Sequence, residues 1–340
     1  TKNFGTINIM TKKKSTWLIP AISLLCFTSA YSKTAFPAKN IDQFATVMQS
    51  QYHISQKWVL RTLQKVKFNK HSIQSITHPA EKKTWGFYKN FFLTPERIRL
   101  GIKYWHTHSK ALHTAQKRFH VQPEIIVAIS GIETLYGTKL GKYNALQALY
   151  TLGFHYQQRA DFFQKELANL FVLCKKQHLD ITNLPSSYAG AIGIPQFMPS
   201  SYNHFAISFS GSPNIDLLHN NNDAIMSIAR YLHQQGWKGN EPIAMPIRVS
   251  KTNKHTLQQH IRNKPIAWYV KKGIIPHDHT NPALHASLMQ LKNHGATEYW
   301  LTFNNFLTIK KYNNSDNYVM AAELLSQAIK QGYNHEYLQH

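Results

Sequence analysis

The sequence predicts a mainly α-helical protein of the α+β class, with a small β-containing subdomain toward the C-terminus. Over residues 40–120 glycine is scarce and apolar residues recur three and four positions apart, the spacing of amphipathic helices. After Trp237 prolines become frequent and short strand-like runs replace that spacing. No internal repeat is present.

Helix boundaries can be predicted at several places. Thr94-Pro95-Glu96 indicates a helix start with proline at the first position. Another helix is expected to begin at Pro123, carry an isoleucine stripe and end near Gly137. Further helices are expected over 160–176 and 223–235, separated by a loop of small residues over 185–201.

The region after Trp237 is expected to contain strands at 243–249 and 287–291, with strand-like character continuing over 299–312. A closing helix is expected over 320–329. We therefore divide the chain after residue 32 into a helical region (33–120), a core (121–240), a β-containing subdomain (241–298) and a C-terminal segment (299–340).

Residues 1–32 have the features of a secretory signal peptide starting at Met10. A basic start at 12–14 precedes an apolar segment at 17–27 and the small-x-small motif Ala30-Tyr31-Ser32. The apolar segment is too short to span a bilayer comfortably, so we expect cleavage and a periplasmic location. Leu25 stands where a lipid-modified cysteine needs a small residue, which disfavours lipoprotein anchoring at Cys26.

The chain carries 39 Lys and Arg residues against 16 Asp and Glu, a formal net charge of +23. This excess favours polyanionic partners: nucleic acid, anionic lipid headgroups or a polymer with free carboxylates. No nucleic-acid motif appears and the basic residues are spread out, so a nucleic-acid partner is not expected. Lipid headgroups would support a peripheral membrane association. Cys174 remains after signal cleavage, and a single thiol is expected to be a small core residue.

Glu133 is the candidate catalytic residue. It lies in the last turn of the apolar helix expected from Pro123, where desolvation and the helix C-terminus both disfavour a charged carboxylate. A carboxylic acid that stays protonated near neutral pH can donate a proton to a glycosidic oxygen. From these residues alone, a surface Glu in a final helical turn, or one bonded to nearby backbone, explains the pattern better than a catalytic acid does.

Several motifs together resemble the membrane-bound lytic murein transglycosylase B family over about residues 40–330. The Gly-rich loop is specific because its order and its distance from Glu133 match together. The matching segments are Gly131-Ile132-Glu133-Thr134, Tyr136-Gly137, Gly141-Lys142, Ala189-Gly190-Ala191-Ile192-Gly193, Pro195-Gln196-Phe197-Met198-Pro199-Ser200-Ser201-Tyr202, Gly236-Trp237, Lys311-Tyr312-Asn313-Asn314-Ser315 and Tyr318.

The resemblance implies a lysozyme-like catalytic core over 121–240, with 299–340 completing a substrate groove. It implies that Glu133 is the single catalytic residue and that no cofactor is needed. It further implies polar contacts to sugar and N-acetyl groups from Ser187 and Gln196, and a groove position for Arg159. The sugar subsites would be shaped by Tyr231, Tyr312, Asn313 and Tyr318.

The implied reaction is cleavage of the β-1,4 bond between N-acetylmuramic acid and N-acetylglucosamine in peptidoglycan, with a 1,6-anhydro product. Most glycosidases use two carboxyl groups, whereas this class uses one Glu as acid and then base. A hydrolytic muramidase and an inactive peptidoglycan-binding protein remain as alternatives. Other carboxylates in the core are expected on solvated faces, namely Glu124, Asp161, Glu166, Asp180, Asp216 and Asp223.

No metal site is expected. Some relatives carry an Asp-rich calcium loop, but the corresponding stretch 208–219 has one carboxylate, Asp216, where calcium needs several oxygen ligands. Among the 20 histidines, neither the His106, His108 and His113 set nor the His277 and His279 pair has the spacing of a tetrahedral site.

Overall fold

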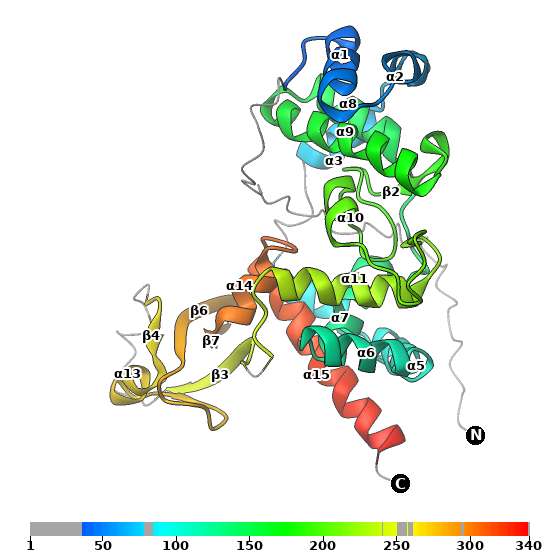
Figure 1. Cartoon of the computed structure of the whole chain (residues 1–340). Helices are drawn as coiled ribbons and strands as arrows, with labels where there is room; N and C mark the ends of the chain where they lie inside the picture. Colours follow the sequence, from blue (N-terminus) through cyan, green and yellow to red (C-terminus); the bar gives the residue numbers. More distant parts are fainter. Residues whose placement is uncertain are drawn as a thin grey trace, which may run out of the picture.

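The computed structural model of the chain describes residues 36–77, 84–239, 241–249, 257, 261–293 and 296–338. Helices dominate it, and a five-stranded sheet forms an outgrowth beside them (Figure 1). The predicted fold class, mainly α with a small β-containing subdomain, is confirmed. The predicted signal peptide over 1–32 lies outside the described residues.

Helices occupy most of the chain up to residue 239 and its C-terminal end, while strands concentrate between 244 and 302. The helices are α1 Ile41–Tyr52, α2 Gln56–Leu63, α3 Lys70–Thr77, α4 Trp85–Phe92, α5 Pro95–Thr107, α6 Ser109–Phe119, α7 Pro123–Thr134, α8 Ala145–His155, α9 Ala160–Gln177, α10 Pro199–Phe205, α11 Asn221–Gln234, α13 Ile266–Lys271, α14 Asn304–Lys310 and α15 Asp316–Tyr337. Short 3-10 helices are η2 Gln157–Arg159 and η3 Ile181–Asn183. The strands are β1 Tyr143–Asn144, β2 Pro185–Ser186, β3 Ala244–Val249, β4 Lys264–Pro265, β5 Ile274–Pro276, β6 His285–Asn293 and β7 Ala296–Thr302.

The predicted helix boundaries are largely confirmed, because the capping residues act as expected. Thr94 accepts a hydrogen bond from the Arg97 N–H at 3.2 Å, and Pro95 takes the first position of α5. α7 begins at the predicted proline, and α9 and α11 cover the two further predicted helices within two residues. α7 ends where Leu135 turns to a left-handed φ of 48°, two residues before the predicted stop at Gly137.

Apart from α13, which packs against the sheet, the helices form two groups joined by α10 (Figure 1). α7 lies at the centre of one group and packs against α5, α6, α11 and α15. Every α7 residue from Ile125 to Thr134 is buried. In the other group α1, α2 and α3 pack on one another or on α8 and α9. Helices from the predicted 33–120 region therefore contribute to both groups.

The sheet is antiparallel at each of its pairings, with the order β4-β6-β7-β3-β5. β3 and β6 confirm the two predicted strands. Neighbouring residues of a strand point to opposite faces, and β7 uses both: Leu301 belongs to a small core with Tyr269 of α13, while Trp300 belongs to the main core. The sheet thus has its own core and is attached to the helices through its other face.

The segment 304–310 is helical, so the strand-like expectation for 299–312 is right up to Thr302 and wrong beyond it. Phe306 and Ile309 lie three positions apart in α14 and are both buried, which is helical spacing. The segment 304–310 is too short for this helical spacing to be distinguished in the sequence from the strand that precedes it.

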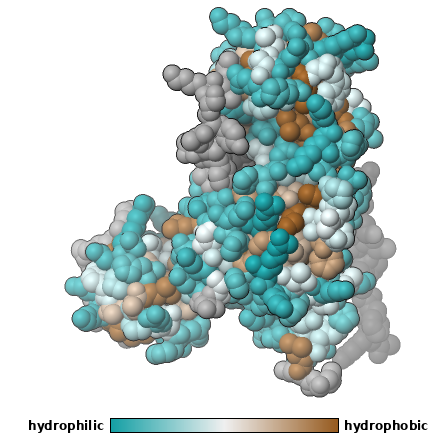
Figure 2. Space-filling model, viewed as in Figure 1, coloured by the Kyte–Doolittle hydropathy of each residue, from teal (hydrophilic) through white to brown (hydrophobic). Residues whose placement is uncertain are grey.

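The exterior of the described chain is predominantly hydrophilic on the face shown in Figure 2, with apolar residues in scattered patches. Among the described residues, no helix combines the length and apolar character required to cross a membrane. Cys174 is 2% exposed within α9, which confirms its expected place in the core.

Candidate active site

Glu133 is the last residue but one of α7 and is 3% exposed. The helix around it is apolar, with Ile129 and Ile132 also buried. Immediately after the helix, Leu135 and Tyr136 adopt left-handed φ angles of 48° and 60°. The carboxyl group therefore lies at a helix C-terminus in a desolvated setting, and both conditions disfavour its charge.

Tyr318, in the first turn of α15, donates a hydrogen bond from its hydroxyl to Glu133 Oε1 at 2.6 Å. Burial raises the pKa of Glu133 to about 8, and the Tyr318 hydrogen bond offsets part of this rise. Burial and the nearby carboxyl raise the pKa of Tyr318 well above its ordinary value, so its hydroxyl stays a donor. At neutral pH Glu133 is therefore an acid that holds its proton.

Replacing Tyr318 by Phe removes the donor that favours the Glu133 carboxylate. Hydrogen bonds to charged groups contribute roughly 1.5–3 kcal/mol, so the pKa of Glu133 should rise by about one to two units. We expect kcat to fall by on the order of tenfold and the alkaline limb of the kcat/KM profile to move to higher pH.

The matched control is Tyr269→Phe in the β subdomain. Tyr269 is fully buried and donates to the Ala286 carbonyl at 3.0 Å. This variant should leave the pH profile unchanged. An alkaline limb that stays in place in Tyr318→Phe would show that this hydrogen bond does not tune the acid.

The Gly-rich loop is tied to the end of α7 through Thr134. The Thr134 hydroxyl donates to the Ile194 carbonyl at 2.9 Å and accepts from the Gly137 N–H at 3.0 Å. Gly193 has a φ of +74°, and an added Cβ would lie 2.4 Å from the Leu217 carbonyl oxygen, so this turn requires glycine. The sequence motif includes this threonine but assigned it no role, although its position directly after the predicted acid was an available signal.

Gln196 lies in this loop with a φ of 50° and is 2% exposed. Its Nε2 donates to the Gly193 carbonyl at 2.9 Å and to the Leu140 carbonyl at 3.2 Å. Its Oε1 is buried and accepts no hydrogen bond from the described residues. A buried acceptor without a donor is unfavourable, so this oxygen suits a ligand that brings an N–H or O–H group.

Tyr231 and Tyr312 form an aromatic wall, with their rings 4.9 Å apart in an edge-on arrangement and both near Phe197. The Tyr231 hydroxyl donates to the Lys311 carbonyl at 2.5 Å, and the Tyr312 hydroxyl donates to the Pro195 carbonyl. Burial and the carboxyl at the end of α7 raise the pKa of Tyr312 well above its ordinary value. The wall therefore joins α11, the segment before α15 and the Gly-rich loop beside the acid.

The other predicted residues lie in different surroundings. Asn313 directly follows this wall and is 1% exposed. Ser187 is 8% exposed, and its Oγ accepts from the backbone N–H groups of Ala189 and Ala191 at 3.3 and 3.1 Å. Arg159 ends η2 in the second helical group, where its guanidinium lies 4.6 Å from the ring centre of Phe162.

The other carboxyl groups of 121–240 each have a local role. The expectation that they lie on solvated faces is wrong for Glu166 and Asp223, which are 5% and 2% exposed because they bond backbone N–H groups of neighbouring segments. Their observed pairings are Glu124 with Lys330, Asp161 with Lys165, Glu166 with Ser200, Asp180 with Thr182, Asp216 with Leu218 and His219, and Asp223 with Phe209 and Asp216.

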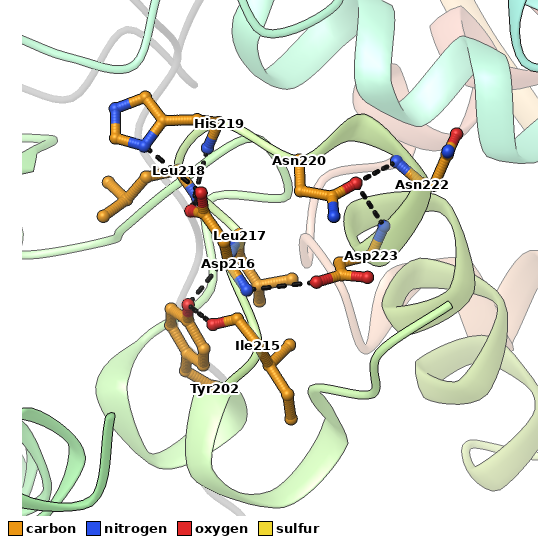
Figure 3. Close-up of polar contacts among 9 residues, drawn as sticks. All are labelled: Tyr202, Ile215, Asp216, Leu217, Leu218, His219, Asn220, Asn222 and Asp223. Atoms are coloured by element: carbon orange, nitrogen blue, oxygen red, sulfur yellow. Dashed lines mark hydrogen bonds and ion pairs between the residues drawn. The ribbon is translucent and has the colours of Figure 1, made fainter. Parts of the chain in front are cut away.

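The stretch 208–219 is organised by carboxylates that bond the backbone (Figure 3). Figure 3 shows Asp223 accepting from the Asp216 N–H at 3.1 Å, and Asp216 accepting from the N–H groups of Leu218 and His219 at 2.8 and 3.0 Å. Asp223 also accepts from the Phe209 N–H at 2.8 Å. Both carboxylates are thus already used in folding the loop. Across the part of the chain that the structure describes, no three His, Cys, Asp or Glu side chains are grouped to hold a metal ion.

Calcium should therefore leave the stability of the purified protein unchanged. Binding to the folded state would raise Tm as the free calcium concentration exceeds Kd. We expect overlapping thermal melts with millimolar calcium and with chelator, and a stabilising shift with calcium alone would refute this prediction.

Comparisons with known proteins identify the family of the chain. The family described as Transglycosylase SLT domain matches residues 37–327. Membrane-bound lytic murein transglycosylase B of Escherichia coli K12 is 34% identical over 283 residues, which cover 83% of this chain and 77% of that protein.

Solved structures show the same similarity. The soluble lytic transglycosylase SltB1 of Pseudomonas aeruginosa has 32% identity and a TM-score of 0.79, covering 86% of this chain and 98% of that one. Escherichia coli Slt35, solved in complex with calcium, has 31% identity and a TM-score of 0.78 over 86% and 92% of the two chains. Pseudomonas aeruginosa SltB3, solved with NAG-NAM-pentapeptide, has 25% identity and a TM-score of 0.77 over 87% and 81%. The chain therefore belongs to the lytic transglycosylase family that the Transglycosylase SLT domain defines.

Proposed function

We propose that this protein cleaves the β-1,4 bond between N-acetylmuramic acid and N-acetylglucosamine in peptidoglycan and leaves 1,6-anhydro-N-acetylmuramic acid ends. The observation that carries the proposal is the buried Glu133, whose pKa is raised to about 8 beside the donor Tyr318. Family membership and the SltB3 complex with NAG-NAM-pentapeptide support the choice of substrate.

Glu133 acts twice in the proposed reaction. First it gives its proton to the glycosidic oxygen as the bond from that oxygen to C1 breaks, and the N-acetyl carbonyl stabilises the positive charge at C1. The carboxylate then takes the proton of the C6 hydroxyl, whose oxygen bonds to C1 and closes the anhydro ring. The proton count balances at Glu133, so neither water nor a second carboxyl group is required. Tyr318 stabilises the carboxylate between the two steps.

The remaining predicted residues would bind the glycan. Gln196 offers its Oε1 to an N–H or hydroxyl group of a sugar, in keeping with its buried acceptor that has no described donor. Ser187 and Asn313 add polar groups, and Arg159 supplies a positive charge for stem-peptide carboxylates. The aromatic wall of Tyr231 and Tyr312 would shape the sugar subsites from a rigid, mostly buried position.

The proposed setting is the periplasm, where the enzyme would act in cell-wall turnover or remodelling. This part rests on the signal-like sequence of residues 1–32 and on the net charge of +23, which suits an insoluble substrate with free carboxylates. Any membrane contact would be peripheral.

Mass spectrometry of digested peptidoglycan tests the product. Purified enzyme should release muropeptides with anhydro ends, and digestion in ¹⁸O-labelled water should leave those ends unlabelled. Reducing ends that carry ¹⁸O would identify a hydrolytic muramidase. Absence of any released muropeptide, from a protein that still sediments with the wall, would identify an inactive binding protein.

A further inference from the structure

Glu166, in the middle of α9, is a buried carboxyl group that the proposed chemistry does not use. Its Oε2 accepts a hydrogen bond from the Ser200 N–H at 2.9 Å, and its Oε1 accepts from the Ser200 hydroxyl at 2.6 Å. The side chain is 5% exposed. Burying a carboxyl group costs free energy unless hydrogen bonds compensate for its lost hydration. A buried carboxyl group outside the proposed chemistry therefore requires an explanation, which the two hydrogen bonds to Ser200 provide.

The two bonds cap α10 from another helix. Ser200 is the second residue of α10, and Met198 at the N-cap position has no side-chain oxygen to accept from the free N–H groups of the first turn. Glu166, 34 residues earlier, supplies that acceptor. The start of α10 is therefore capped by a residue of α9 and not by an N-cap side chain of its own.

This cap lies directly after the loop that carries Gln196. On its α7 side the loop is held by Thr134 on Ile194 and by Tyr312 on Pro195. On its exit side the chain reaches α10 within three residues, where Glu166 holds it to α9. The Gln196 loop thus lies between an anchor on the helix that carries the acid and an anchor on the other helical group.

α9 also begins directly after Arg159, the residue proposed to contact stem-peptide carboxylates. We propose that Glu166 is a positioning residue for substrate binding, which aligns the Gln196 loop with the helical group that bears Arg159. The inference rests on the proposed function for the roles of those two residues. It predicts that loss of the cap weakens binding of glycan more than it slows the chemical step at Glu133.

Two substitutions at Glu166 and one at a nearby residue distinguish positioning of the Gln196 loop from general stabilisation of the fold. Glu166→Ala removes both acceptors. Glu166→Gln keeps the shape, since the amide can accept from the Ser200 N–H and donate to its hydroxyl. The control is Gln164→Ala on the same helix, because Gln164 is 1% exposed and makes three buried hydrogen bonds, to Ala38 and Gly153.

Kinetics on soluble glycan strands supply the first readout. Glu166→Ala should raise KM by about tenfold while kcat changes less than about threefold. Glu166→Gln should restore KM to within roughly twofold of the wild type. Gln164→Ala should lower Tm and leave KM unchanged, whereas a KM rise equal to that of Glu166→Ala would reduce the role of Glu166 to general stability.

The side-chain amide signal of Gln196 in ¹⁵N-labelled, ligand-free protein supplies the second readout. It should shift in Glu166→Ala and stay in place in Gln164→Ala, and an unmoved signal together with an unchanged KM would overturn the proposal. If Glu166→Ala does not fold, Ser200→Ala removes the 2.6 Å bond alone and should raise KM in the same direction; an unchanged KM there also overturns it. Failure of the proposed function would instead appear as ¹⁸O-labelled reducing ends, while the change in KM and the shift of the Gln196 amide signal would still be observed.

Discussion

Replacing Glu133 by Gln should lower the rate of muropeptide release by at least about a thousandfold. General acid or base catalysis typically contributes about 10²–10⁴-fold to a rate, and here one carboxyl group serves both steps. The amide keeps the size of the side chain and can still accept the Tyr318 hydrogen bond, but it cannot exchange the proton. The loss should therefore appear in kcat, with wall binding retained.

Glu323→Gln is the matched control for this experiment. Glu323 lies on α15, is 7% exposed, and has a pKa that burial raises to about 7. Its side chain bonds Gln327 rather than the site, so the same isosteric change should leave activity near the wild-type level. A Glu133→Gln enzyme that keeps more than about a tenth of wild-type activity would mean that another group supplies the acid.

The same substitution should make the protein more stable at neutral and alkaline pH. Glu133 has a pKa of about 8 in the folded protein against an ordinary value of 4.5. Between these two pH values the unfolded chain has released this proton and the folded chain has kept it, so stability falls as pH rises. At about 1.4 kcal/mol for each pKa unit, the cost reaches at most roughly 4–5 kcal/mol above pH 8.

Thermal melts of wild type and Glu133→Gln across this pH range measure the effect. The two Tm values should coincide below pH 4.5 and diverge as pH rises to 8, with the variant higher by several degrees. Glu323→Gln should show a similar but smaller divergence that ends near pH 7, with activity retained. Equal Tm values for wild type and Glu133→Gln at pH 8 would show that burial of this carboxyl group is not costly.

Much of the site could be predicted because it follows local rules. The apolar stripe and its terminal carboxyl group placed Glu133 at a helix end, and the Gly-rich motif placed Gln196 in a loop. The structure adds the degree of burial, since the pKa shift depends on α7 being enclosed by helices from elsewhere in the chain. The sequence of α7 alone does not show which other helices pack against it.

The long-range contacts were beyond sequence reasoning. Tyr318 was singled out as a sugar-subsite residue, yet it bonds the acid across 185 residues. Glu166 and Asp223 lie in helices that the sequence predicts, where a carboxylate is expected on a solvated face, and only the fold brings them to the N–H groups of Ser200 and Phe209. A polar side chain can be buried only where it finds hydrogen-bond partners, and for these residues the partners lie on other helices and loops.

The protonation state of Glu133 at neutral pH decides whether this residue can act as the acid. The direct measurement is ¹³C NMR of protein labelled at the glutamate side-chain carboxyl carbons, titrated from below pH 4.5 to above pH 8, with Glu133→Gln identifying the resonance. The predicted midpoint for Glu133 is about 8. A midpoint near 4.5, the ordinary value for Glu, would mean that the carboxyl group is ionised at neutral pH and would contradict the account.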